Sequence, residues 1–262
     1  DTARQLVRAG DLETLEMLYD DISGTLSQLI RTAFIPKKGH RLIVADFSAI
    51  EARVIAWLAG EQWRLDVFNT HGKIYEASAE QMFHLPPGSV KKGDPMRQKG
   101  KIAELALGYG GSTGALISMG ALAMGLKEEE LKPLVYSWRS ANPNITKFWW
   151  DTDAAAKATI NTQTPSYLPH GIAFRKKGSL LRLRLPNGRE LSYVKPMVIN
   201  DDITYEGTLQ GSGHWGRIES YGPKLVENIV QAVARDCLAE TIMKVEAMGY
   251  PVVFHVHDEL IC

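Results

Sequence analysis

The sequence predicts a mixed α/β (α+β) fold in which a mostly helical insertion separates two strand-bearing segments. Apolar residues recur at helical intervals in the first part of the chain, whereas they alternate with polar residues after Pro165. The 262 residues are 45% hydrophobic and 23% charged, as in ordinary globular proteins. This composition excludes a disordered tail, a collagen-like repeat and a coiled coil.

Residues 1–30 are predicted to be helical, because leucine and isoleucine recur there at roughly helical intervals. A turn at residues 36–39 leads into residues 41–46, an apolar run that predicts a short buried strand. A helix is then expected from Ser48. Ser48 and Glu51 have the spacing of a capping box, in which each side chain bonds the backbone of the other residue.

Helices are expected over most of residues 61–150. Beyond Pro165 the alternation predicts hairpins, and a long helix with proline in its first turn is expected from Gly222 to Gly249. Strands are predicted at residues 181–185, 190–194, 203–209, 217–221, 252–257 and 259–261. The last two strands would form a hairpin whose tight turn contains Asp258.

The formal charge is balanced, with 30 Lys and Arg residues against 30 Asp and Glu residues, so bulk charge favours no particular partner. Basic residues nevertheless cluster in two segments, 91–101 and 175–189. Two such patches would suit a polyanion that is contacted on one face. An ordinary solvated surface remains the alternative for each patch taken singly.

The longest apolar run, residues 115–126, is too short to span a bilayer, and no signal peptide opens the chain. Cys237 and Cys262 offer neither a disulfide framework nor a metal-binding pair. We therefore expect a soluble protein of the cytoplasm without a membrane partner. Because the chain starts with Asp1 and ends within an apolar run, we also expect it to be a piece of a longer protein.

An acidic residue, Asp46, closes the predicted strand just before the helix of Glu51. A carboxylate at a strand end, beside backbone carbonyls, suits a hard cation. Taken singly, Asp46 is also explained as a cap or turn residue, and Glu51 as the acid of the capping box.

Arg97, Lys101, Leu105 and Tyr109 recur every four residues, which places them on one slanting stripe of a helix. The two cations could bind phosphate oxygens, and the aromatic ring could stack on a base. Such a stripe would suit a nucleoside triphosphate. The alternative is a solvated basic face that ends in a buried tyrosine.

Asp258 and Glu259 lie at the tip of the last predicted hairpin, directly after His257. Like charges crowd one another there in the absence of a cation. An ordinary polar turn is the alternative. A zinc site at His257 is weakly supported, because neither a cysteine nor a second spaced histidine pair lies nearby.

Together, and in this order, the three stretches resemble the motifs of the family A DNA polymerases, the class of bacterial DNA polymerase I. The motifs are DFSAIEARVIAWLAG after a strand, R-x3-K-x7-YG, and a hairpin bearing HVHDE. The first motif and the segment LPNGRELSYVKP are similar to phage-encoded members in particular. The resemblance extends from Leu29 to Glu259 and implies a template-directed DNA polymerase that acts in replication.

The family implies a right-hand architecture with an antiparallel palm sheet and helical fingers. Residues 1–60 and 166–262 would form the palm, and residues 61–165 the fingers. A thumb and an exonuclease domain are expected to be absent. The implied partners are primer–template DNA and deoxynucleoside triphosphates, bound by a monomer in the cytoplasm of a bacterial or phage-infected host cell.

Carried over from the family, Asp46 and Asp258 look like the two metal-binding carboxylates, with the backbone carbonyl of Phe47 as a further ligand. Two Mg²⁺ ions, which Mn²⁺ could replace, would clamp the attacking and leaving oxygens of the transfer. Arg97 and Lys101 resemble the cations that hold the incoming triphosphate. Lys101 also resembles the general acid towards the leaving pyrophosphate.

Tyr109 matches the residue that stacks near the templating base, and Glu51 matches the side chain that excludes a 2′-hydroxyl. The sequence departs from the family at several positions, among them Gln98, which replaces a common second arginine. Leu105 stands where an aromatic ring is frequent, and we expect it still to pack against the sugar. Tyr75 stands where a histidine is frequent and carries no charge, so triphosphate affinity would rest more on the two cations.

Five further residues are expected to contact DNA. Gln231 resembles a contact to the minor groove of the primer–template, and His257 would lie near the primer end. Arg182, Arg184 and Arg189 could hold backbone phosphates, which supply affinity without sequence readout.

Three rival functions share parts of this pattern. A single-subunit RNA polymerase would use the same palm chemistry, but the bulky acid Glu51 should exclude ribose. A metal-dependent nuclease would use the same carboxylates and leave the stripe from Arg97 to Tyr109 without a task. A non-catalytic nucleic-acid-binding remnant stays open, because a chain without a thumb should bind primer–template weakly.

Overall fold

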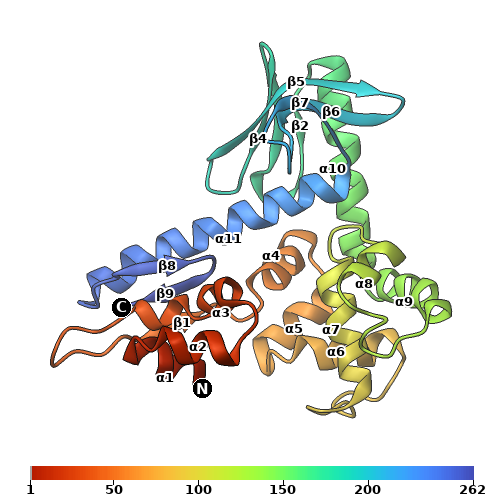
Figure 1. The fold of residues 1–262 in the computed structure, drawn as a ribbon. Helices are drawn as coiled ribbons and strands as arrows, with labels where there is room; N and C mark the ends of the chain where they lie inside the picture. Colours follow the sequence, from red (N-terminus) through yellow and green to blue (C-terminus); the bar gives the residue numbers. More distant parts are fainter. Residues whose placement is uncertain (1) are drawn as a thin grey trace. The chain divides into compact units, whose positions relative to one another are not determined.

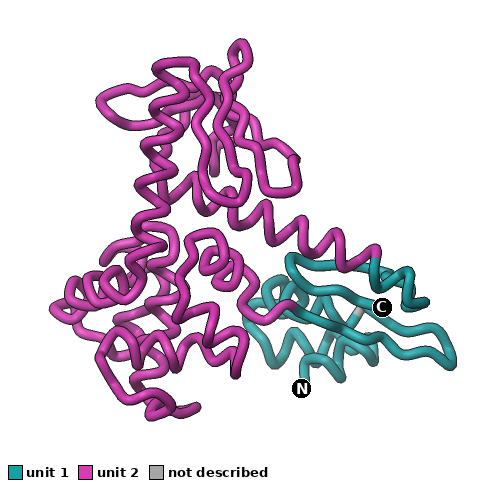
Figure 2. Tube along the Cα trace, turned by 180° about the vertical axis from the view of Figure 1, so that it is seen from behind, with its two compact units in different colours: residues 1–46, 244–262 teal, residues 47–243 magenta. Residues whose placement is uncertain are grey.

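The computed structural model describes residues 2–262 and confirms the mixed α/β fold, with helices and antiparallel sheets (Figure 1). The chain divides into two compact units (Figure 2). Unit 1 comprises the chain up to residue 46 together with residues 244–262, and unit 2 comprises residues 47–243. No helix in the described part of the chain is long and apolar enough to cross a membrane.

The start of unit 1 is helical as predicted, in short pieces. These are α1 (Thr2–Ala9), α2 (Leu12–Leu18), α3 (Ile22–Gln28) and the 3₁₀ helix η1 (Ile30–Ala33). Gly10 adopts a left-handed conformation (φ +73°) just after α1. Asp11 and Asp21 begin the next two helices, because each carboxylate accepts a hydrogen bond from a backbone N–H three residues further on, at 3.0 and 2.8 Å.

Unit 1 also contains an antiparallel sheet with the strand order β1-β9-β8. Its strands are β1 (Val44–Asp46), β8 (Phe254–Val256) and β9 (Glu259–Ile261). The predicted hairpin of β8 and β9 is confirmed, but the prediction of a buried strand at residues 41–46 was wrong. β1 is short and lies at the edge of the sheet, so Val44 is 52% exposed. Leu260 and Ile261 are buried, because β9 is the central strand.

The first part of unit 2 is the predicted helical insertion. Its helices are α4 (Ile50–Ala59), α5 (Gln62–Thr70), α6 (Ile74–Met82), α7 (Pro95–Leu107), α8 (Thr113–Ser118), α9 (Glu128–Ala141) and α10 (Pro143–Thr162). Helices α6 and α7 pack closely at Gly100, where an added Cβ atom would overlap the carbonyl oxygen of Tyr75. Any side chain at this position would push the two helices apart.

The predicted capping box of α4 does not form, so this prediction was wrong. The helix begins at Ile50 and follows Ala49, whose backbone is left-handed (φ +53°) and whose side chain offers no cap. Because the chain enters α4 through this left-handed residue, Ser48 does not occupy the N-cap position. The carboxylate of Glu51 is therefore available to a different partner.

The second part of unit 2 is a six-stranded antiparallel sheet whose strands follow one another in chain order. The strands are β2 (Ser166–Tyr167), β3 (Ala173–Lys177), β4 (Leu180–Arg184), β5 (Glu190–Ile199), β6 (Asp202–Thr208) and β7 (Trp215–Ser220). Helix α10 contacts β2, β3 and β5 on one face of the sheet, and the buried Phe174, Leu181 and Leu183 belong to the core there (Figure 1). The predicted long helix follows as α11 (Gly222–Ala247).

Candidate active site

The two carboxylates predicted to bind metal lie together in unit 1. Asp46 ends β1 and is directly opposite Glu259 in the sheet, and Asp258 precedes Glu259 in the hairpin turn. Partial removal from water, and then the negative charges of Asp258 and Glu259, raise the pKa of Asp46. The side chains of Asp46 and Asp258 are close enough to share a hydrogen bond. Folding thus unites acids from opposite ends of the chain.

Neighbouring residues determine the turn geometry and the charge around Asp46 and Asp258. His257 adopts a left-handed backbone conformation (φ +49°) that lets the hairpin turn tightly, and its side chain is exposed. Arg31 of η1 forms an ion pair with Glu259 at 2.9 Å, and its positive charge opposes the rise in the pKa of Asp46. Phe47, whose carbonyl is a predicted ligand, directly follows Asp46.

In unit 2, helix α7 carries Arg97, Lys101 and Leu105 of the predicted stripe. The helix ends at Leu107, so Tyr109 lies just beyond it rather than on it, and the prediction of one continuous helical stripe was wrong at this residue. Leu105 is 51% exposed. Lys101 is half-buried and forms no ion pair with any residue from 2 to 262.

Arg97 has an acidic partner that the sequence did not predict. Its Nε donates a hydrogen bond to Oε1 of Glu76 on α6 at 2.7 Å. Its guanidinium also lies 5.4 Å from the centre of the Tyr75 ring. Burial, and then the charge of Glu104, raise the pKa of Tyr75, so its phenol stays protonated and can donate a hydrogen bond.

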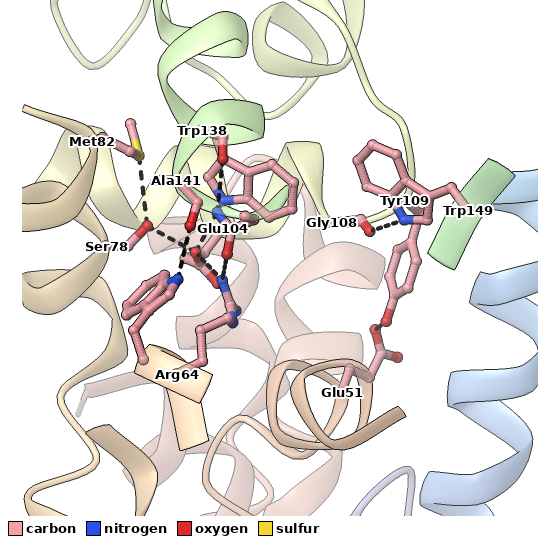
Figure 3. Close-up of polar contacts among 12 residues, drawn as sticks. Glu51, Arg64, Ser78, Met82, Glu104, Gly108, Tyr109, Trp138, Ala141 and Trp149 are labelled. Atoms are coloured by element: carbon pink, nitrogen blue, oxygen red, sulfur yellow. Dashed lines mark hydrogen bonds and ion pairs between the residues drawn. The ribbon is translucent and has the colours of Figure 1, made fainter. Parts of the chain in front are cut away.

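Tyr109 reaches back to α4. Its hydroxyl donates a hydrogen bond to Oε2 of Glu51 at 3.0 Å (Figure 3). Burial, and then the negative charge of Glu51, raise the pKa of Tyr109, which keeps the phenol protonated as a donor. The next residue, Gly110, has φ +75°, and an added Cβ atom would lie 2.6 Å from the side chain of Pro223.

A buried ion pair joins α5 to α7. Arg64 on α5 and Glu104 on α7 are 1% and 4% exposed, and the guanidinium donates to both carboxylate oxygens (Figure 3). Ser78 Oγ and Trp138 Nε1 also donate to Glu104, at 2.8 and 3.0 Å. Asn142 Oδ1 accepts a further hydrogen bond from Arg64 at 3.0 Å. The carboxylate of Glu104 thereby ties α7 to α5, α6 and α9.

The three arginines predicted to hold DNA phosphates differ in their surroundings. Arg189 forms an ion pair with Asp236 on α11 at 2.9 Å. Arg182 lies 3.6 Å from Glu190, and Arg184 is exposed. Arg189 is thus held against α11, whereas Arg182 and Arg184 lie two positions apart on β4.

Helix α11 carries the predicted DNA contact Gln231, which is exposed and donates a hydrogen bond to Glu227 at 3.4 Å. The same helix secures the six-stranded sheet. Asn228 Nδ2 donates to the hydroxyl of Tyr193 on β5 at 3.0 Å. Tyr193 packs edge-on against Tyr205, with 5.0 Å between the ring centres.

Comparison with protein families matches residues 16–168, more than half of the chain, to the family described as DNA polymerase family A. The chain belongs to family A of the DNA polymerases. The chain is 58% identical over 267 aligned residues to the DNA polymerase of Bacillus phage SP02, a match that covers 100% of the chain. The match covers 41% of the phage protein, so the chain spans about two fifths of that relative's length. The resemblance to phage-encoded members is thus confirmed.

More distant relatives match shorter segments of the chain. It is 38% identical over 86 residues to the thermostable DNA polymerase I of Thermus thermophilus, which covers 32% of the chain and 10% of that protein. Among solved structures, it is similar to the POL domain of Pol1 from M. smegmatis in complex with DNA primer-template and dNTP, with a TM-score of 0.56. That match covers 87% of this chain and 34% of the other at 20% identity, and it supports the fold alone.

Four charged residues that contact predicted site residues or their neighbours were not predicted from the sequence, namely Arg31, Arg64, Glu76 and Glu104. A charge that lies among the apolar positions of α7 could have revealed Glu104, because a buried charge requires a partner. The sequence does not indicate that Arg64 is the partner of Glu104, since the two residues are 40 positions apart.

Proposed function

We propose that this chain carries the polymerising part of a phage-derived DNA polymerase, which adds deoxynucleotides to the 3′ end of a primer on a DNA template. The pairing of Asp46 with Asp258, in a chain of family A, is the observation that supports this most directly. In this proposal residues 1–60 and 166–262 act as the palm, and residues 61–165 act as the fingers. The protein would work as a monomer in the cytoplasm of a bacterial or phage-infected host cell.

The oxygen donors at the carboxylate pair suit Mg²⁺. Asp46 and Asp258 would hold the metal, and the carbonyl of Phe47 is a further candidate ligand. Within residues 2–262, no group of three or more His, Cys, Asp or Glu side chains could hold a metal. Two carboxylates agree with the usual binding of Mg²⁺, which takes its other ligands from substrate phosphates and water. Two bound Mg²⁺ or Mn²⁺ ions would neutralise charge on the attacking and leaving oxygens.

The side chains of α6 and α7 would bind and orient the triphosphate. Lys101 is available to a phosphate oxygen and could donate a proton to the leaving pyrophosphate. Arg97 would exchange Glu76 for a phosphate oxygen, and Tyr75 would add one neutral hydrogen bond. The exposed Leu105 would pack against the sugar.

Glu51 would select the sugar. Held by Tyr109, its carboxylate would occupy the space that a 2′-hydroxyl requires, which favours deoxynucleotides over ribonucleotides. This role distinguishes the proposal from a single-subunit RNA polymerase.

Primer–template DNA would be contacted from both parts of the proposed palm. In unit 1, the exposed His257 would lie near the primer end. In unit 2, Gln231 would contact the minor groove of the duplex, and Arg182 and Arg184 would meet backbone phosphates. Arg189 would join them only if it left Asp236.

Single-nucleotide incorporation by the purified chain tests the proposal. With primed template and Mg²⁺, the unmodified chain is expected to add one deoxynucleotide, and Asp46→Asn and Asp258→Asn are expected to add none. Lys101→Ala should slow incorporation by at least about tenfold if Lys101 is the general acid. Asp20→Asn, which changes an exposed acid of unit 1, is the matched control and should incorporate normally.

The rival functions give different results in the same assay. Shortening of the primer would favour a nuclease, and a preference for ribonucleotides would favour an RNA polymerase. DNA binding without incorporation under any condition would favour a non-catalytic remnant. Each of these results contradicts the proposal.

A further inference from the structure

One face of the six-stranded sheet carries a cluster of like charges. The strand register places Arg175 of β3 directly opposite Arg182 of β4. Lys177 and Arg184 lie on the same face, because side chains two positions apart on a strand point the same way. Strands β2 to β5, which the structure describes in full, contribute one acidic residue to this face. It is Glu190, which lies opposite Arg184. The alternate positions point into the core beside α10.

These cations are poorly compensated within the chain. Like charges directly opposite one another on neighbouring strands destabilise a sheet. Among residues 2–262, no ion pair engages Arg175, Lys177 or Arg184. Arg182 lies 3.6 Å from Glu190, yet its Nε is buried and has no hydrogen-bond partner among the described atoms. A rigid surface that holds unpaired cations side by side favours an anionic ligand.

The surrounding sequence strengthens this positive field. No acidic residue occurs between Asp153 and Glu190. Carboxylates within this stretch of the sequence therefore do not weaken the positive field, and Glu190 at its end lies opposite Arg184.

An exposed aromatic ring lies on the same face. Tyr167 of β2 is opposite Ala173, which in turn is opposite Arg184, and the tyrosine is 69% exposed. Cations beside an exposed ring form the combination that binds single strands, because phosphates meet the cations while an unpaired base stacks on the ring. A duplex keeps its bases paired and stacked inside, so it could not use the ring.

We infer that this face binds single-stranded DNA. The sheet face, as we name it, consists of Tyr167, Arg175, Lys177, Arg182 and Arg184. That the polyanion is DNA rests on the proposed polymerase function, since template that has not been copied is single-stranded. Contacts to phosphates and to the flat side of a base carry no sequence information, so the binding should be independent of sequence.

Fluorescence anisotropy of a labelled single-stranded oligonucleotide measures this binding without catalysis. The double variant Arg175→Gln and Arg184→Gln should weaken binding at least about fivefold and lessen its salt dependence, because fewer phosphates are neutralised. Tyr167→Ala should weaken it by at least about fivefold through lost stacking. The matched control, Lys132→Gln with Lys147→Gln, removes two exposed charges from α9 and α10 and should leave affinity unchanged.

Unchanged affinity in the arginine double variant, with native circular dichroism, would overturn the inference. Tighter binding of a blunt duplex than of the single strand, or a Tyr167→Ala variant that binds normally, would overturn the assignment to single strands. Incorporation assays separate this failure from that of the proposed function. If the chain extends primers and the sheet-face variants bind single strands normally, only the inference is contradicted. If the variants lose single-strand binding but the chain never extends a primer, only the polymerase proposal is contradicted.

Discussion

The hydroxyl of Tyr109 bonds to the carboxylate of Glu51 at 3.0 Å, which joins the segment after α7 to the first turn of α4. Since the capping box of α4 does not form, this hydrogen bond orients the Glu51 side chain in its place (Figure 3). The residue proposed to recognise the sugar is thus held by the residue proposed to stack near the template base. This relationship leads to a direct test.

Tyr109→Phe keeps the ring and removes only the hydroxyl. The Glu51 carboxylate would lose its donor and become free to turn away, so we expect the preference for dATP over ATP to fall about tenfold, the value of a hydrogen bond to a charged group. The ratio of kcat/KM for the two nucleotides measures this. Tyr136→Phe, on an exposed tyrosine of α9, is the control. An unchanged ratio in Tyr109→Phe would show that the hydrogen bond has no part in sugar selection.

Glu104→Leu should destabilise unit 2 strongly, because it leaves the guanidinium of Arg64 buried without its counter-charge. We expect the free energy of unfolding to fall by about 3–5 kcal/mol. Adding Arg64→Met removes the second charge and should restore most of the loss. Urea unfolding measures both effects. The exposed pair of Lys147 and Asp151 supplies the control, since Lys147→Gln should cost less than about 1 kcal/mol. Equal costs for Glu104→Leu and Lys147→Gln would contradict the assigned importance of the buried pair.

Glu76→Gln should strengthen nucleotide binding. The carboxylate of Glu76 competes with the triphosphate for Arg97, and a neutral amide competes less well. We expect the KM for a deoxynucleotide to fall several-fold while kcat changes little. Steady-state incorporation measures the two separately, with Glu129→Gln on an exposed acid of α9 as the control. A rise in KM would mean instead that Glu76 holds Arg97 in the orientation that binds the triphosphate.

The phenol of Tyr193 makes the stability of unit 2 sensitive to alkaline pH. Burial raises the pKa of Tyr193 to about 12, against a usual value of about 10 in an unfolded chain. A raised pKa means that its stabilising contribution is fully present below about pH 10 and is lost as the pH rises through about 12. At pH 11 we expect a loss of about 1 kcal/mol.

Urea unfolding at pH 9 and pH 11 tests this dependence. Tyr193→Phe cannot ionise, so the difference in unfolding free energy between the two pH values should shrink by the amount that Tyr193 contributes. Tyr136→Phe, which alters an exposed phenol, should keep the full difference. If both variants behave alike, the alkaline loss comes from other groups.

Local patterns predicted the hairpin of β8 and β9 and the long helix α11, because alternation, turn residues and capping proline all act over a few positions. They did not distinguish an edge strand from a central one, since the apolar run before Asp46 looks the same in either place. They also predicted a capping box wrongly. Ser48 and Glu51 have its spacing, but the left-handed Ala49 occupies the N-cap position.

The candidate site required information that no local pattern contains. Asp46 and Asp258 were expected together only through the resemblance to a known family, and the sheet register then places them at one edge. Contacts such as that of Arg64 with Glu104 depend on how separate helices pack. A charged residue in either helix has an equally ordinary explanation as solvated surface, so the sequence alone could not single out the pair.

Gly100 has a mechanical consequence for the nucleotide binding that we propose. Because nothing but hydrogen separates the two backbones at this point, α6 and α7 cannot slide or rotate past one another without collision. Tyr75 and Glu76 on α6 would then move together with Arg97 on α7 as one rigid body. Any swing of this region on nucleotide arrival would carry the cation and its competing acid together, so that Arg97 changes partner by a turn of its own side chain.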